Sequence, residues 1–246
     1  MSLNGMSSSD SLTQRGPLLP IAVDVMGGDH GLGVQVEGAV LACKEFGAAV
    51  VLVGPEAELI AKLDSLSARH LPITVRNAPE VITMDDTPAR AVRRKPNSSL
   101  CVAYNLVQAG EASCILSSGN SGAMMAAGSM ICGLLPGIER PAIATLIPGV
   151  ADGRPNVILD SGANVGCQAH HLVQFAVMGS IYYSSLLNES RPKVALLSNG
   201  TEPSKGTDVI RAASMLLSDM KLVNYVGYVE GRDVASSAAD VIVCDG

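Results

Sequence analysis

Four loops of small and polar residues are the stretches of this sequence that could hold a ligand. Each contains glycine and follows a short apolar run. They are residues 26–31, 117–122, 160–166 and 198–206. Backbone N–H groups between a strand and a helix lack internal partners, so such loops favour an anion. The alternative for the second loop is a tight turn in which Asn120 or Ser121 caps the next helix.

Motif spacing excludes several other kinds of site. No GxGxxG follows a strand and GxxxxGK[ST] is missing, so neither a dinucleotide-binding loop nor a P-loop is predicted. Residues 119–122 do not fit GxSxG, which argues against a nucleophile elbow. None of the histidines begins the HxxxxD pattern of glycerol-lipid O-acyltransferases. Cys167 and His170 offer only two ligands, so we predict no metal and no cofactor.

The composition favours a protein with an aliphatic core in the cytoplasm. Hydrophobic residues make up 48% of the 246 residues and tryptophan is absent, which suits a parallel α/β sheet. The net charge of −6 argues against nucleic-acid binding. No apolar run reaches the roughly 20 residues that span a bilayer. The six cysteines lack CxxC spacing, so most are expected to be core residues in a reducing cytosol.

Apolar runs alternate with helical stretches along most of the chain. Strands are expected at 21–25, 50–53, 73–75, 114–116, 142–147, 157–159, 194–197, 223–227 and 241–243. The alternation predicts an α/β fold, a doubly wound, mostly parallel sheet with helices on both faces, Rossmann-like. Right-handed crossovers would place successive loops on one edge of that sheet. A turn at 152–155 predicts a hairpin between the fifth and sixth strands, which makes the sheet mixed.

We expect residues 21–246 to form a single α/β domain after a disordered, serine-rich tail at residues 1–20. Within this domain, 114–116 is expected to be a buried strand and 123–135 a buried helix. The sequence stops directly after a strand, at Gly246, which predicts a truncation at the C-terminal end.

A predicted helix begins at Asp86 or Thr87, with Pro88 at its first position, and ends before Pro96. It carries four cations in six residues, which is unusual in an acidic chain. They are Arg90, Arg93, Arg94 and Lys95. The helix face is either solvated or a site for an acidic or phosphorylated partner.

Seven segments, in order along the chain, resemble signature segments of one family. They are 24–30 (DVMGGDH), 90–99 (RAVRRKPNSS), 118–125 (SGNSGAMM), 137–142 (GIERPA), 162–165 (GANV), 200–202 (GTE) with 205–206 (KG), and 229–233 (VEGRD). The family is the bacterial phosphate acyltransferase of phospholipid synthesis. The resemblance implies a fold similar to the phosphotransacetylase and isocitrate-dehydrogenase-like group.

The resemblance also implies a reaction and partners. The enzyme would form acyl phosphate from fatty acyl-(acyl-carrier-protein) and inorganic phosphate, feeding glycerol-3-phosphate acylation. It would be a homodimer, use no cofactor, and associate peripherally, at the inner face of the cell membrane, with a membrane glycerol-3-phosphate acyltransferase. The family continues beyond Gly246 with helical segments. The sequence departs from the family's usual residues at Ser198 (Asn), Gly166 (Asp) and Tyr228 (Asn).

Phosphate at pH 7 is substantially dianionic and can attack a thioester without a general base, so the protein must position it and stabilise charge. The predicted catalytic residues are Lys205, Asn120 and Asn164. Lys205 would polarise the carbonyl or neutralise the departing thiolate; its alternative is a solvated lysine. Phosphate or acyl phosphate is expected at Gly27, Gly28, Ser118, Gly119, Ser121, Gly122, Gly162, Ala163, Gly200 and Thr201. The carrier protein or its phosphopantetheine is expected at Arg93, Arg94 and Lys95.

Asp24 and Asp160 would repel phosphate, so we expect them to cap and shape their loops.

Two other functions stay open. A phosphotransacetylase-like enzyme would use a short acyl-CoA and not the acyl-carrier protein. A non-catalytic scaffold would bind the carrier protein without phosphate-dependent deacylation.

Overall fold

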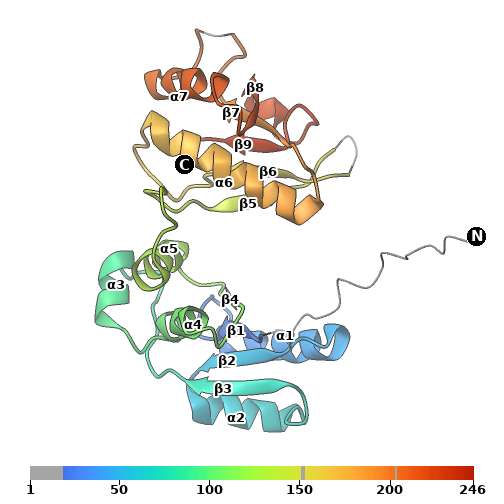
Figure 1. Cartoon of the computed structure of the whole chain (residues 1–246). Helices are drawn as coiled ribbons and strands as arrows, with labels where there is room; N and C mark the ends of the chain where they lie inside the picture. Colours follow the sequence, from blue (N-terminus) through green and yellow to red (C-terminus); the bar gives the residue numbers. More distant parts are fainter. Residues whose placement is uncertain (1–18, 151–152, 203) are drawn as a thin grey trace, which may run out of the picture. The chain divides into compact units, whose positions relative to one another are not determined.

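The computed structural model describes residues 19–150, 153–202 and 204–246. Of the predicted tail at 1–20, all but Leu19 and Pro20 lies outside the described residues. The chain divides into two compact units, and the division falls between Gly133 and Leu134. Each unit contains its own sheet (Figure 1). The expected single sheet is thus corrected: residues 133–143, rich in glycine and proline, form neither helix nor strand and interrupt the alternation.

The first unit is built on a four-stranded parallel sheet in the order β3-β2-β1-β4. Its strands are β1 (Ile21–Asp24), β2 (Val50–Gly54), β3 (Ile73–Asn77) and β4 (Cys114–Leu116). Its longer helices are α1 (Gly31–Phe46), α2 (Glu56–Ser65) and α4 (Ser99–Gln108). The chain winds from β1 to β3 on one side and then returns to place β4 on the other side of β1.

Helices cover both faces of this sheet, as predicted. Successive strand residues point to opposite faces. Val23 and Leu52 pack in the cluster that contains residues of α1 and α2. Ala22 and Val51 pack in a separate cluster with Ala103 and other residues of α4. The strands β1 and β2 are therefore apolar on both sides, which explains why they are continuous apolar runs in the sequence.

Two expectations about the region around β4 are wrong. β4 is an edge strand rather than a buried one, and Leu116 is 58% exposed. The helix expected at 123–135 consists of α5 (Ser121–Ala127) and a π-helical turn, η1 (Gly128–Cys132). Within it only Ala123 and Ala127 are buried, in the cluster with α4 and α3 (Pro88–Arg94). Met124, Ala126 and Ile131 pack against the same cluster but are only partly buried.

The second unit has a five-stranded mixed sheet in the order β5-β6-β9-β7-β8. Its strands are β5 (Ala144–Ile147), β6 (Asn156–Leu159), β7 (Lys193–Leu197), β8 (Asn224–Val229) and β9 (Val241–Val243). β5 is antiparallel to β6, which confirms the predicted hairpin, and the other pairs are parallel.

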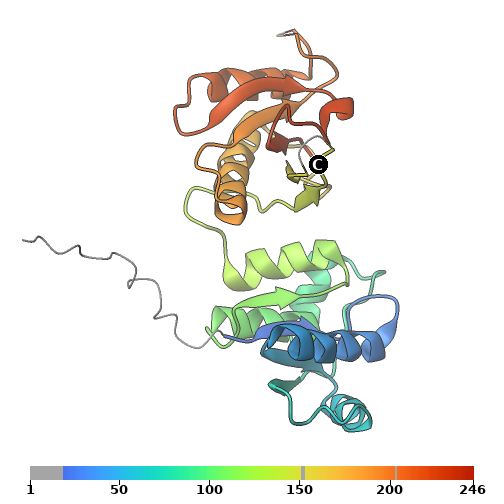
Figure 2. The same cartoon turned by 90° about the vertical axis from the view of Figure 1, so that its right-hand side faces the viewer.

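Helix α6 (Ala169–Leu187) lies along this sheet, with α7 (Asp208–Ser218) beside it (Figure 2). Phe175 and Tyr183 of α6 are fully buried against Val157, Val194 and Val241 of the strands. A short 3-10 turn, η2 (Gly231–Asp233), follows β8. Among the described residues, no helix is both long enough and apolar enough to cross a membrane.

Candidate functional site

The carboxyl ends of β1 and β4 lie side by side in the first unit. Val23 of β1 is in register with Leu116 of β4. After β1 the chain forms β2 and β3 on one side of β1, whereas β4 lies on its other side. The point between β1 and β4 is therefore a topological switch. In open parallel sheets, ligands bind beside such a switch at the carboxyl ends of the strands. The loops that meet here are 25–30 and 117–120, two of the four loops predicted from the sequence.

These two loops touch through small side chains. The Ser118 hydroxyl donates to the Gly27 carbonyl over 3.1 Å, and Gln35 of α1 donates to the Ser118 hydroxyl over 2.7 Å. A Cβ at Gly27 would come within 2.8 Å of both the Asp24 carboxylate and the Ser117 hydroxyl. Glycine is therefore required at position 27, because the neighbouring loop approaches its backbone too closely for any side chain.

Gly28 and Gly119 cannot easily be replaced by other residues, for two different reasons. Gly28 has a φ of 95°, which other residues rarely adopt, and a Cβ there would overlap the Ser118 hydroxyl. Gly119, by contrast, is not among the positive-φ residues. A Cβ at Gly119 would instead lie 3.1 Å from the Gly27 α-carbon. Space rather than torsion restricts Gly119.

Asp24 has the structural role that we predicted for it. Its side chain is buried, and its Oδ2 accepts a hydrogen bond of 2.7 Å from the Ser117 hydroxyl. Its Oδ1 accepts from the Met26 backbone N–H over 3.3 Å. The carboxylate thus joins the strand end to the neighbouring loop instead of facing a ligand.

Asn120 is the N-cap of α5, which confirms the alternative of a helix cap. Its Oδ1 accepts from the Ala123 backbone N–H over 3.0 Å. Its Nδ2 donates to the carbonyls of Thr83, Met84 and Asp86 at 3.2, 3.4 and 3.3 Å. The amide expected to face substrate is thus occupied, and Asn120 positions residues 83–86. Next to it, Ser121 is exposed and a Cβ at Gly122 would lie 2.8 Å from Pro88 Cγ.

The start of α1 adds free donors beside the first loop. His30 occupies the N-cap position, but its side chain makes no capping hydrogen bond within the described residues. The first turn of α1 contains no acidic residue. The first backbone N–H groups of a helix have no partner within the helix, so this end of α1 has unsatisfied donors and a positive dipole.

In the second unit, the loop after β6 folds around the carboxylate of Asp160. Oδ2 accepts from the backbone N–H groups of Ala163 and Asn164 at 3.1 and 2.6 Å, and from the Asn164 amide at 2.8 Å. Oδ1 accepts from the Ile143 N–H over 2.8 Å. Asp160 is fully buried, so its predicted structural role is confirmed. The donors expected at Ala163 and Asn164 are already used. Gly162 has a φ of 90°, and a Cβ there would have no described atom within 4 Å.

The loop after β7 contains the candidate cation. Lys205 is exposed, and its ammonium has no hydrogen bond or ion pair with any described residue. The aliphatic part of the Lys205 side chain packs over Gly200, where a Cβ would come within 2.7 Å of Lys205 Cγ. Thr201 is also exposed and lines a separate hollow between α7 and β8. The structure therefore brings Gly200 and Lys205 together and leaves the lysine free to meet an anion.

A hollow of about 590 Å³ lies beside this loop, and it was not predicted from the sequence. It is lined by Leu197, Ser198, Asn199, Gly206, Thr207, Ile210 and Gly231. Ser198, where the sequence departs from the family's usual asparagine, is buried in its wall. No sequence signal could predict it, because the hollow depends on β8 and its following turn lying next to β7.

In the cationic helix α3, the structure separates Lys95 from the arginines. The Lys95 ammonium lies 2.6 Å from the Asp86 carboxylate and donates to the Val81 carbonyl over 2.9 Å. The hydrogen bond from Lys95 holds the pKa of Asp86 below its usual value. Arg93 and Arg94 are exposed. Lys95 is thus part of the local structure, and only the arginines are available to a partner.

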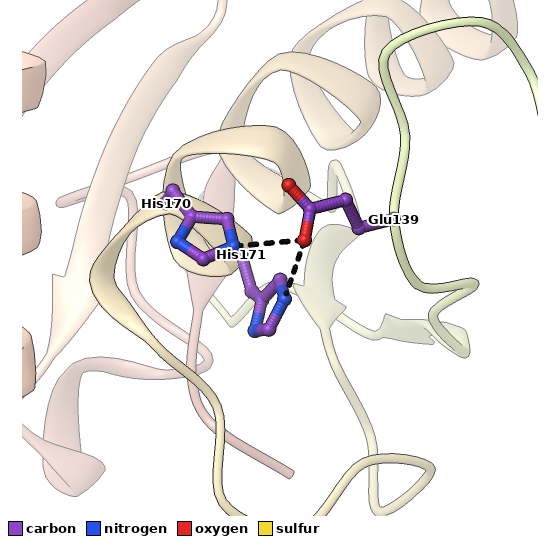
Figure 3. Close-up of side chains that lie close together, drawn as sticks. All are labelled: Glu139, His170 and His171. Carbon is purple, nitrogen blue, oxygen red and sulfur yellow. Dashed lines mark hydrogen bonds and ion pairs between the residues drawn. The ribbon is translucent and has the colours of Figure 1, made fainter.

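A cluster that the sequence did not indicate joins Glu139 to the start of α6 (Figure 3). Glu139 Oε2 lies 3.0 Å from His170 Nε2 and 3.4 Å from His171 Nε2. The hydrogen bond with His170 lowers the pKa of Glu139, and burial lowers the pKa of His171. Glu139 and the histidines are about thirty positions apart, so only the fold reveals their contact.

The three side chains have metal-ligand types, but their hydrogen bonds do not suit a metal. The Gln168 backbone N–H donates to His171 Nδ1 over 3.0 Å, so the neutral ring carries its proton on Nε2. A metal would need the Nε2 lone pair, and a ligand histidine ordinarily donates from its other nitrogen. Cys167, which the sequence paired with His170, is not in this group.

Residues 139–143 are tied to the loop after β6 by further hydrogen bonds. Arg140 donates to the Val165 carbonyl over 3.2 Å, and the Pro141 carbonyl accepts from the Asn164 amide over 2.7 Å. Glu139 is fixed at its backbone as well, where its N–H donates to Gln174 over 3.0 Å. The segments GIERPA and GANV, far apart in the sequence, thus form one hydrogen-bonded assembly in which Asn164 is structural.

Comparisons with known proteins agree with the fold and specify the family. The family model described as "Fatty acid synthesis protein" matches residues 19–246. The curated "Phosphate acyltransferase" of Syntrophotalea carbinolica is 47% identical over 226 residues, which are 92% of this chain and 64% of that protein. The "Phosphate acyltransferase" of Geobacter sp. (strain M21) is 50% identical over 226 residues, 92% of this chain and 63% of that protein. The chain spans a little under two thirds of the length of these curated relatives.

Solved structures show the same fold at low sequence identity. EutD phosphotransacetylase from Staphylococcus aureus has a TM-score of 0.64 at 18% identity, covering 92% of this chain and 77% of that one. A phosphotransacetylase from Streptococcus pyogenes has a TM-score of 0.63 at 18% identity, covering 93% and 77%. The predicted similarity to the phosphotransacetylase fold is confirmed. With the family model matched from residue 19 to the last residue, the chain belongs to the fatty acid synthesis protein family.

Proposed function

We propose that this protein forms acyl phosphate from inorganic phosphate and a fatty acyl thioester of acyl-carrier protein, a product that feeds glycerol-3-phosphate acylation. The observation that carries the proposal is the pair of glycine loops at the switch between β1 and β4, next to the uncapped start of α1. The curated relatives, named phosphate acyltransferases, support the same reaction class.

In the proposed reaction, a phosphate oxygen forms a bond to the thioester carbonyl carbon and the carbon–sulfur bond then breaks. The thiolate leaves with the electron pair and is protonated by solvent. The backbone N–H groups of Gly27, Gly28 and Ser118 bind the phosphate oxygens, because they donate to no described residue. The Gly119 N–H already donates to the Ser117 hydroxyl over 3.2 Å, so Gly119 contributes space rather than a donor. Hydrogen bonds to a charged group contribute about 1.5–3 kcal/mol each, so a few of them suffice for millimolar phosphate.

Charge that develops in the reaction also needs a cation. We assign this role to Lys205, whose ammonium is exposed and unpaired among the described residues. Asn120 and Asn164 act in the proposal by positioning their loops and not by touching substrate. The carrier protein is acidic in this proposal and meets the exposed arginines of α3. A homodimer and peripheral contact with a membrane glycerol-3-phosphate acyltransferase remain predictions from the family resemblance.

The decisive experiment incubates the purified protein with acyl-(acyl-carrier-protein) and phosphate, and traps acyl phosphate with hydroxylamine. Hydroxamate that forms only when phosphate is present supports the proposal. Turnover of short acyl-CoA without turnover of acyl-carrier protein would favour the phosphotransacetylase-like alternative, for which the fold likeness is the supporting observation. Carrier-protein binding without any deacylation would favour the scaffold.

A further inference from the structure

A small polar hollow lies against α3, and no residue of the glycine loops lines it. Its volume is about 290 Å³, and it is lined by Asp85, Asp86, Thr87, Arg90, Ala91, Arg94 and Lys95. Arg90 and Arg94 are four residues apart on a helix, so both guanidinium groups belong to the same face. Arg93, between them in the sequence, does not line the hollow. Arg90 and Arg94 therefore line the same hollow, whereas Arg93 does not.

The charges around the hollow leave a net positive site. Lys95 is neutralised by Asp86 at 2.6 Å. Neither Arg90 nor Arg94 has an ion pair within the described part of the chain, and both are exposed. Like charges at this spacing destabilise a helix, so the pair has no structural benefit to the protein by itself. With Asp85 as the remaining carboxylate, the free charges sum to one positive charge, which an anion can balance.

The wall of the hollow that residues 85–87 form is held in place by hydrogen bonds within the protein. Asp86 Oδ2 accepts from the Thr83 backbone N–H over 2.8 Å in addition to its bond with Lys95. Asn120 holds the same segment through three carbonyls. Because Asn120 also caps α5, this wall is connected directly to the glycine loop at 117–120. A preorganised site loses less free energy to ordering when a ligand binds.

We propose that Arg90 and Arg94 bind the phosphate of a phosphopantetheine arm. A guanidinium group offers paired donors that match phosphate oxygens, so two of them can hold one phosphate group from two sides. The hollow exceeds the roughly 30 Å³ taken by one water molecule by about tenfold, which leaves room for the adjoining part of an organic ester. The phosphate site stands on the geometry alone, while the organic arm rests on the proposed acyl transfer.

The test is calorimetric titration of the full chain with 4′-phosphopantetheine, pantetheine and inorganic phosphate. We expect 4′-phosphopantetheine to bind at least about tenfold more tightly than pantetheine, which lacks the charged group. The variant R90A/R94A should lose about tenfold or more in affinity for 4′-phosphopantetheine, and R90K/R94K should lose less because it keeps the charge but not the paired donors. R93A is the matched control and should stay within about twofold.

A second variant tests the charge balance of the hollow. D85N removes the unpaired carboxylate and should tighten 4′-phosphopantetheine binding by about twofold or more. Equal losses in R93A and R90A/R94A would overturn the proposal, because they would mean diffuse attraction to a basic helix. Unchanged affinity in R90A/R94A, or inorganic phosphate binding as tightly as the ester at this site, would overturn it too.

The same preparations separate this site from the proposed reaction. If wild-type protein forms no acyl phosphate but R90A/R94A still loses 4′-phosphopantetheine binding, the site stands and the proposed function fails. If acyl phosphate forms and the variant keeps the KM of wild type for acyl-carrier protein, the function stands and the site fails.

Discussion

Asp24 and Asp160 occupy equivalent places in two different sheets, since each comes at the end of a strand and before a glycine-containing loop. The Asp24 carboxylate binds a serine of the neighbouring loop and one backbone N–H. Asp160 gathers three donors of its own loop and one from residue 143. The first arrangement leaves the backbone N–H groups of Gly27, Gly28 and Ser118 without a described partner, although the Gly119 N–H donates to Ser117. The second arrangement uses the donors of Ala163 and Asn164. Similar sequence thus produces an open loop in one unit and a closed loop in the other.

The largest difference between the two aspartates should appear in the free energy of unfolding. Asp160→Ala leaves several buried donors without a partner, at about 1–3 kcal/mol each, so we expect a loss of at least about 3 kcal/mol in unfolding free energy. Asp24→Ala removes two bonds, one of them long, and should lose about half as much. Urea unfolding of both variants measures this, and equal losses would mean that the two carboxylates stabilise their units equally.

Lys205, the candidate cation of the second unit, should affect the rate of turnover and not the stability of the fold. Lys205→Ala should lower phosphate-dependent turnover by about 100-fold, the usual scale for one preorganised charge stabiliser. Because the side chain is exposed, the melting temperature should not change. Lys221→Ala, an exposed lysine outside the loop, is the control. Near-normal turnover at saturating phosphate would remove Lys205 from the mechanism.

The cluster at the start of α6 should make the stability of the second unit fall as the pH drops below the usual pKa of histidine. Burial depresses the pKa of His171, so its contribution is present above about 6.5, the unfolded pKa, and is lost as the pH falls through the folded pKa. The pKa of Glu139 is also lowered, and its contribution is lost at still lower pH. His171→Gln should flatten the decline in unfolding free energy below pH 6.5. Parallel declines in both proteins would contradict the assignment.

The smallest effect concerns the two kinds of cation on α3. Lys95→Ala breaks the pair with Asp86 and should lower the melting temperature slightly, because the pair is partly exposed. Arg93→Ala should leave the melting temperature unchanged, because Arg93 is exposed and has no hydrogen bond or ion pair within the described chain. Scanning calorimetry of the two variants measures both melting temperatures. A larger shift for Arg93→Ala would reverse the distinction between structural and available cations.

Much of the fold follows from local sequence signals. Pro88 begins α3 as predicted, because propensity and capping act over a few residues. The division into two sheets could not be predicted, since alternation of helices and strands does not tell which strands pair. β4 looked buried from its apolar residues alone, and only its place at the sheet edge shows otherwise.

The site was predictable in outline and not in the role of each residue. The sequence identified the loops and the repulsion between Asp24 or Asp160 and a phosphate. It could not show that the Asn120 amide is used by residues 83–86, because those partners lie more than thirty positions away. The Glu139 contact with His171 was missed for the same reason. Side chains whose partners are distant in sequence are assigned only by the fold.

The most direct test compares phosphate binding in one variant of each kind of loop. Gly119→Val places side-chain atoms against Gly27 in the open loop, whereas Gly162→Ala adds a methyl group, with backbone strain at a φ of 90°, to the closed one. Calorimetric titration with phosphate, at matched melting temperature, should show a loss of about tenfold or more for Gly119→Val and less than about twofold for Gly162→Ala. Unchanged phosphate affinity in Gly119→Val, or an equal loss in both variants, would contradict the assignment of phosphate to the switch between β1 and β4.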